Sequence, residues 1–139
     1  MWQCDYKQDA KINLEKLWNL FSDVSKWTQW NANIESARLG GDFKEGAKGY
    51  IKLKDQPDQP FTVTSIEAGK KLALRADIMS FGVSIIFENI AQAKENGVYS
   101  IENKITVEGG LASLVGITMG AKLKEAVKKS VEKVIELAA

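Results

Sequence analysis

Residues 12–31 read INLEKLWNLFSDVSKWTQWN, a stretch that combines a helical repeat of large apolar side chains with two closely spaced tryptophans. The apolar residues that recur at the spacing of one helix face are Leu14, Leu17, Trp18 and Phe21. Asn13 is a suitable N-cap for that helix. Trp27 and Trp30 are three residues apart, so on a second, shorter helical turn they share a face. The stretch therefore predicts a short helix followed by a second short helix or turn, whose two tryptophans either pack into the core or contact a bound ligand.

On both sides of this stretch, apolar and polar residues alternate, which is typical of half-buried strands. The opening residues place Trp2, Cys4 and Tyr6 on one face. Further strands are predicted at 34–39, 47–54, 61–66, 71–78, 79–90 and 98–108. Residues 56–60 are expected to be a loop, because neither Pro57 nor Pro60 has an N–H to donate to a sheet. Residues 94–97, KENG, suit a hairpin turn. Short turns between successive strands favour an antiparallel meander.

The last part of the chain changes period after the glycines at 109 and 110, and residues 111–137 read as one long helix. Gly116 and Gly120 lie inside it, where each costs about 1 kcal/mol relative to alanine. They either leave volume beneath the helix or allow it to pack closely on the sheet. Alternatively, the helix begins only near Gly120 and residues 111–119 form a mobile gate. The long helix is the natural cover for the apolar face of the sheet, so we expect one α+β domain over residues 1–139.

The composition limits the chemistry that this chain can perform. It has 139 residues, of which 45 % are hydrophobic, and a net charge of +1, which gives no reason to expect binding to nucleic acid. The absence of histidine excludes Ser–His and Cys–His nucleophilic mechanisms and histidine metal sites. The lone cysteine, Cys4, allows no internal disulfide and no cysteine-pair zinc site. With no evident signal peptide or membrane-spanning stretch, we expect a cytoplasmic protein without cofactor, metal or stable membrane insertion.

Several segments also resemble one superfamily. Residues 12–39 are similar to the opening of START-like proteins, also called SRPBCC or Bet v 1-like, whose polyketide cyclase/dehydrase branch commonly has the signature vW..l.D...W..W. The matching residues here are Leu17, Trp18, Leu20, Asp23, Trp27 and Trp30. Residues 45–54, EGAKGYIKLK, resemble the family's glycine-starting strand, and residues 65–78, SIEAGKKLALRADI, resemble its strand–turn–strand segment, with leucine in place of a frequent aromatic. The resemblance covers essentially the whole chain.

The fold that this resemblance implies is the helix-grip: a curved antiparallel sheet wrapped around a long C-terminal helix, with two short helices after strand 1 and a cavity between sheet and helix. Members of the family bind lipids, sterols, polyketides or hormones. Some are cyclases and some are chaperone regulators, so the fold does not decide the function. We expect an internal cavity that takes a hydrophobic or amphipathic small molecule.

Candidate ligand-binding residues follow from the inward face of the predicted strands and helix. They are Phe61, Val63, Leu74, Ala76, Phe81, Phe87, Tyr99, Ile101, Asn103, Ile105, Leu114 and Met119. The inward face also includes Leu72, Ile78, Val83, Ile85 and Val107. Any one of these residues is equally typical of a plain hydrophobic core. We expect the mouth of the cavity near residues 111–120, facing the loops at 56–60 and 77–81.

Asn103 is the most informative candidate, because strict alternation places its amide between Ile101 and Ile105 on the apolar face. An unpaired buried amide costs about 1–3 kcal/mol, so it needs a neighbour, a water or a ligand as partner. The alternative is a bulge that turns Asn103 outward. Binding of a small molecule is the favoured function. The alternatives are a cyclase or dehydrase using Tyr99, Asn103, Asp77 or an ordered water, and a protein-interaction module with an exposed apolar patch.

Overall fold

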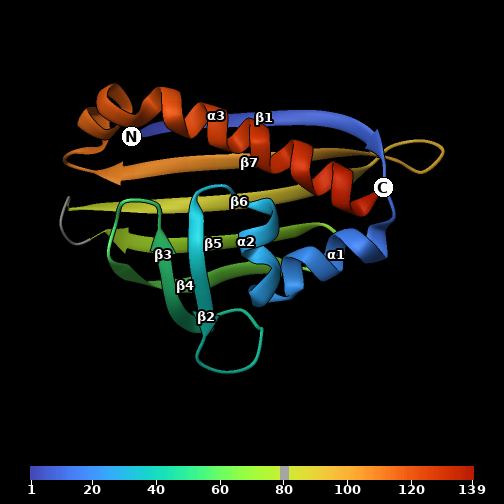
Figure 1. Cartoon of the computed structure of the whole chain (residues 1–139), viewed down its shortest axis with the longest axis horizontal. Coiled ribbons are helices and arrows are strands. Elements are labelled where there is room, and N and C mark those ends of the chain that lie inside the picture. The colour runs from blue at the N-terminus through green and yellow to red at the C-terminus, as the bar shows by residue number, and fades with distance from the viewer. Residues whose placement is uncertain (79–81) are drawn as a thin grey trace.

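The computed structural model describes residues 1–78 and 82–139, and these residues form one sheet with helices on one of its faces (Figure 1). In chain order the elements are β1 (Trp2–Lys11), α1 (Leu14–Ser22), the 3-10 helix η1 (Val24–Lys26), α2 (Trp27–Trp30), β2 (Ile34–Leu39), β3 (Lys48–Leu53), β4 (Asp58–Glu67), β5 (Lys71–Ile78), β6 (Val83–Ala93), β7 (Val98–Gly109) and α3 (Ala112–Ala138). The expected class and element order are confirmed: an antiparallel sheet, short helices after β1 and a long last helix.

The sheet has seven strands in the order β1-β7-β6-β5-β4-β3-β2, and all neighbouring strands are antiparallel. From β2 to β7 the strands follow one another as a meander, and β1 closes the series beside β7. The register aligns Asn103 of β7 with Tyr6 of β1 on one side and with Asn89 of β6 on the other. Paired residues face the same side of a sheet, so these three side chains lie on the inward face with the core.

The long helix α3 packs against β1 and β7 and runs obliquely over the sheet (Figure 1). It is helical from Ala112 onward, so the alternative in which residues 111–119 are non-helical is wrong. Its far end meets the start of α1, where the Asn13 backbone N–H donates to Ala138 O at 2.7 Å. None of the helices in the described residues combines the length and the apolar character needed to cross a lipid bilayer.

Gly116 and Gly120 allow α3 to lie directly on the indole of Trp2. A Cβ atom at Gly116 would stand 2.6 Å from Trp2 Nε1 and 2.7 Å from Trp2 Cγ, and one at Gly120 would stand 3.2 Å from Trp2 Cζ2. Of the two roles considered for these glycines, close packing on the sheet is therefore the one that the structure has.

The short helices carry the two tryptophans into the core. Trp27 is 0 % exposed and Trp30 is 2 % exposed. Each indole donates a hydrogen bond to the end of α1: Trp27 Nε1 to Phe21 O at 2.8 Å, and Trp30 Nε1 to Leu20 O at 2.9 Å. Phe21 lies between Trp30 and Trp18, with ring centroids 5.3 Å and 6.2 Å apart. The tryptophan pair is thus part of the core.

The strand boundaries differ from expectation at β4, which begins at Asp58 inside the stretch expected to be a loop. Pro60 pairs with Tyr50 of β3, whereas pairing with β5 begins only at Phe61. At Pro60 the strand therefore has a neighbour on one side only, and the missing N–H removes no bond from a second neighbour. The strand expected at 79–90 is described from Val83 onward and runs to Ala93; residues 79–81 lie outside the described part.

Candidate functional site

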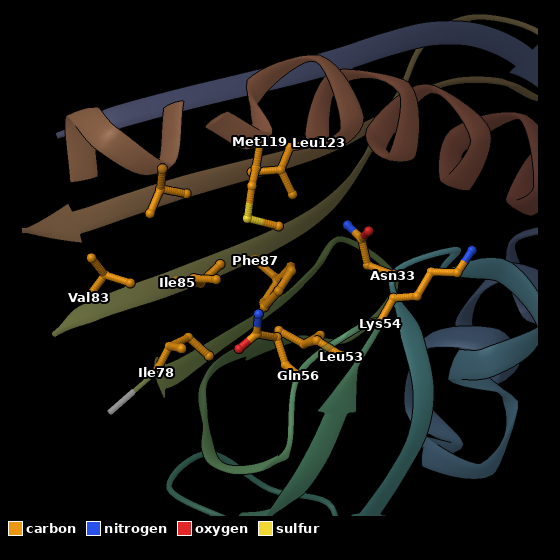
Figure 2. A pocket seen from close by; sticks show the side chains of 11 residues that line it. Asn33, Leu53, Lys54, Gln56, Ile78, Val83, Ile85, Phe87, Met119 and Leu123 are labelled. Atoms are coloured by element: carbon orange, nitrogen blue, oxygen red, sulfur yellow. The ribbon is translucent and has the colours of Figure 1, made fainter. Parts of the chain in front are cut away.

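An apolar cavity lies between the sheet and one side of α3 (Figure 2). Its hydrophobic lining comes from β3, β5, β6 and α3 and consists of Leu53, Ile78, Val83, Ile85, Phe87, Val115, Met119 and Leu123. Met119 and Leu123 hang from α3 over Phe87 of β6 in Figure 2. The helix packs against β1 and β7, and the cavity lies between its other side and the strands β5 and β6.

The cavity has a volume of about 60 Å³, which is small for a binding site. Pockets that enclose drug-sized ligands usually measure about 300–1,000 Å³. A volume of about 10–15 Å³ suffices for one water molecule, so this cavity takes only a few non-hydrogen atoms as it stands. Met119 has a flexible thioether side chain, and its movement is the simplest way to enlarge the space.

The polar lining of the cavity comes from the turns beside β2 and β3. It consists of Asn33 just before β2, and Lys54 and Gln56 just after β3. Figure 2 shows Asn33 and Lys54 on one side of Phe87, with Ile78 and Val83 on the other. The turn that carries Lys54 and Gln56 includes Asp55, whose φ of 63° places it in the left-handed region. The end of the cavity near Ile78 and Val83 is thus apolar, and Asn33 and Lys54 lie at the other end.

Of the candidates taken from the sequence, Phe87 and Met119 line this cavity. Phe61, Val63, Leu74 and Ala76 are buried on the inward face but belong to the packed core; Phe61 lies against Trp27, with ring centroids 5.6 Å apart. Ile101 and Ile105 are likewise buried. Tyr99 pairs with Ala93, which places it at the opposite end of β6 from Val83 and Phe87.

Two further candidates lie elsewhere. Leu114 is 51 % exposed, because a residue one position before Val115 is rotated by about 100° around the helix and points away from the sheet. Together with Leu111 and Ile117 it forms an exposed apolar patch at the start of α3. Phe81 falls within residues 79–81, outside the described part of the chain.

Sequence reasoning did not name six lining residues as candidates: Leu53 at the end of β3, Asn33, Lys54 and Gln56 in the turns beside β2 and β3, and Val115 and Leu123 of α3. Alternation could have identified Leu53, because it follows Gly49 and Ile51 on one face of its strand. Asn33 and Gln56 lie outside any regular period. No sequence pattern indicates that these turns reach the cavity.

Asn103 faces inward and is 4 % exposed, but its amide is held by another side chain. Asn103 Nδ2 donates to Asn89 Oδ1 at 2.6 Å, and Asn89 Nδ2 reaches Leu72 O at 3.5 Å. The outward orientation considered above is therefore wrong. Of the partners expected for the amide, a neighbouring residue is the one found, and the pair forms a polar bridge between β6 and β7.

Replacing Asn103 with leucine is expected to lower the free energy of unfolding by about 1–2 kcal/mol, because Asn89, 2 % exposed, loses its donor. Removing both amides leaves no unpaired group, so Asn89→Leu with Asn103→Leu is expected to recover part of that loss. Urea unfolding followed by circular dichroism measures both values. If the double variant loses more free energy of unfolding than the two single variants lose together, this assignment is wrong.

The ionisable groups of the described residues do not form a catalytic cluster in this cavity. Asp77 lies on the outer face of β5, where its carboxylate accepts a hydrogen bond from Ser84 Oγ at 2.6 Å and lies 3.5 Å from Arg75 Nε. Burial raises the pKa of the Cys4 thiol, which disfavours the reactive thiolate. No group of three or more acidic or cysteine side chains suited to a metal ion occurs among the residues described.

The outer face of the sheet carries solvated charges, as its alternation indicates. Glu88 lies 3.9 Å from Lys71, and Glu108 lies 3.7 Å from Arg75. The pKa of Glu102 is raised by partial burial and by a hydrogen bond with Asp5 across the β1–β7 pair. These groups stand on the opposite side of the sheet from the cavity, so they cannot act on its contents.

Comparisons with known proteins bear on the fold. No protein-family model and no curated protein matches the sequence. A hypothetical protein from Helicobacter pylori has a similar structure, with a TM-score of 0.85 and 11 % identity over 99 % of this chain and 88 % of its own. Truncated norcoclaurine synthase from Thalictrum flavum gives a TM-score of 0.68 and 10 % identity over 96 % of this chain and 92 % of the synthase.

A third similar structure is StfQ, a di-domain ARO/CYC protein from the steffimycin biosynthetic pathway. Its TM-score is 0.72 at 6 % identity, and the match covers 98 % of this chain but 50 % of StfQ. Identities this low show the architecture and not the activity. The structural neighbours are Bet v 1-like proteins, and this chain has their helix-grip fold.

Proposed function

We propose that this protein binds a hydrophobic or amphipathic small molecule in the cavity between the sheet and α3. The observation that carries the proposal is the apolar lining, from Ile78 and Val83 to Met119 and Leu123, with a few polar groups from Asn33, Lys54 and Gln56. Such a lining, with a few convergent polar groups, is typical of small-molecule sites. The Bet v 1-like fold typically binds hydrophobic ligands, which supports the same conclusion.

Binding requires the cavity to widen from its volume of about 60 Å³. The first turns of α3 are suited to this movement. Their N-cap, Leu111, offers no side-chain hydrogen bond, and they contain two glycines. The missing cap and the glycines each weaken the start of the helix. Met119 and Leu123 line both the cavity and a surface groove beside α3, so they separate the interior from the outside. The structure described here corresponds to the closed state in this proposal.

A cyclase or dehydrase activity has less support, because Tyr99, Asn103 and Asp77 do not line the cavity. Such a reaction needs polar groups that converge on the substrate. A role restricted to protein interaction was expected to go with an exposed apolar patch and no cavity. The described residues contain both the patch at Leu111, Leu114 and Ile117 and the cavity, so ligand binding remains the better explanation.

The proposal is tested with the neutral fluorescent probe N-phenyl-1-naphthylamine. The unmodified protein is expected to enhance the fluorescence of the probe, and Ile85→Trp to weaken its binding by about tenfold or more, since the indole would occupy the cavity. Ile86→Trp is the matched control, because Ile86 is the next residue of β6, is also half-buried and faces the other side of the sheet.

Thermal unfolding of both variants checks that they are folded. Equal loss of probe binding in the two variants, or no binding by the unmodified protein, would overturn the proposal. A second variant, Met119→Ala, removes part of the barrier between cavity and groove and is expected to strengthen probe binding.

A further inference from the structure

The charge carried by the described lining of the cavity is positive. Lys54 is the only charged residue among the described residues that line the cavity. Asn33 and Gln56 are the other polar residues of the lining, and in the described part of the chain none of these three side chains forms a hydrogen bond or ion pair with another residue. These groups are therefore free to bind something other than the protein itself.

Lys52 of β3 is a neighbouring lysine that does have an ion-pair partner. Its Nζ lies 2.7 Å from Glu35 Oε2, across the β2–β3 pair. Lys54, two residues further along, is exposed and has no carboxylate within ion-pair distance among the residues described. Lys54 lines the cavity and carries the free ammonium, which points away from Phe87 in Figure 2, whereas the neutralised Lys52 does not line the cavity.

The groove outside the mouth continues this positive charge. It shares Asn33, Lys54, Met119 and Leu123 with the cavity and adds Lys122 and Lys129 from α3. Two carboxylates also line the groove. Glu125 lies 4.0 Å from Lys129 and so neutralises it, which leaves Asp55 against Lys54 and Lys122. The balance at the mouth is positive.

We infer that the ligand is an anionic amphiphile, whose negatively charged head binds Lys54 and the Asn33 amide at the mouth while its apolar chain enters past Phe87 toward Ile85 and Val83. This inference rests on the proposed function, because it names the chemical class of ligand for the same cavity. An ammonium and an amide supply donors for a carboxylate, sulfonate or phosphate oxygen. A cationic head would be repelled by Lys54 and Lys122.

The test compares octanoate, octan-1-ol and octylammonium, three probes with the same chain and different heads, by isothermal titration calorimetry at low ionic strength. Octanoate is expected to bind about fivefold tighter than octanol, in keeping with a partly exposed charge pair, and octylammonium weakest. In Lys54→Met, octanoate is expected to lose this advantage while octanol binds as before. Lys52→Met is the matched control and is expected to keep the advantage.

The outcomes separate this inference from the proposed function. If the neutral naphthylamine probe binds but octanoate has no advantage over octanol, or keeps it in Lys54→Met, the anionic head is wrong and the cavity remains a binding site. If octylammonium binds tightest, the inference is also wrong. If the neutral probe fails to bind as well, the proposed function itself fails.

Discussion

Replacing Trp27 with alanine is expected to lower the free energy of unfolding by about 3–5 kcal/mol, the range found when a large aromatic side chain is removed from a core. Trp27 is 0 % exposed and packs its ring 5.6 Å from that of Phe61 in β4. Its removal leaves a cavity between α2 and the sheet. It also leaves Phe21 O without the donor that now lies at 2.8 Å. Urea unfolding followed by far-ultraviolet circular dichroism measures the loss.

Two controls divide this loss into its parts. Trp27→Phe keeps an aromatic ring against Phe61 and removes the N–H, so it is expected to retain part of the stability that alanine loses. Trp18→Ala removes a half-buried indole from the same aromatic group and is expected to cost less than Trp27→Ala. A loss for Trp27→Ala no larger than that for Trp18→Ala would contradict the central position of Trp27 in the core.

Replacing Gly116 with alanine is expected to destabilise the protein by about 2–3 kcal/mol, near the upper end of the usual cost of overpacking. Helix propensity alone predicts the opposite sign, a gain of about 1 kcal/mol. The structure decides between them, because the added methyl group would overlap the indole of Trp2, reaching 2.6 Å from its Nε1. Either the indole or the first half of α3 must then move. Thermal and urea unfolding measure the change.

A double-variant cycle isolates this clash. When Trp2 is replaced with alanine the obstruction is gone, so Gly116→Ala in that background is expected to stabilise the protein by about 1 kcal/mol, as helix propensity predicts. Gly120→Ala is the milder comparison, since its Cβ would come only within 3.2 Å of Trp2 Cζ2. If Gly116→Ala has the same sign with and without Trp2, the assigned contact is wrong.

The alternation of apolar and polar residues was sufficient to locate most of the sheet. The strands at 34–39 and 71–78 have the predicted bounds, and the hairpin at 94–97 joins β6 to β7. The error at β4 arose because Pro60 was judged by what it lacks, an N–H, without knowledge of which side of the strand has a neighbour. That information is not local: it depends on where the pairing of β4 with β5 begins, at Phe61 and Ala76.

The candidate site was less accessible to prediction, because facing inward is a weaker property than lining a cavity. Val63 and Phe87 both face inward, but Val63 is packed in the core and Phe87 lies at the open space. The difference is made by α3, which packs against β1 and β7 and leaves a space between its other side and the strands β5 and β6. For Asn103, the sequence indicated the need for a partner, but only the strand register identified Asn89.

The sequence by itself determined the order of the elements and the faces of the strands, because each follows from a short-range period. It left open whether the last helix begins before Gly116, and the structure shows that it begins at Ala112. The position of α3 on the sheet was decided only in the tertiary structure, and with it the cavity and the neighbours of Lys54. Asn33, Lys54, Ile85 and Met119 come from four separate segments of the chain and meet at one space. Periodicity indicates which face of a strand or helix a residue occupies. It does not indicate which other element packs against that position, because that depends on long-range packing.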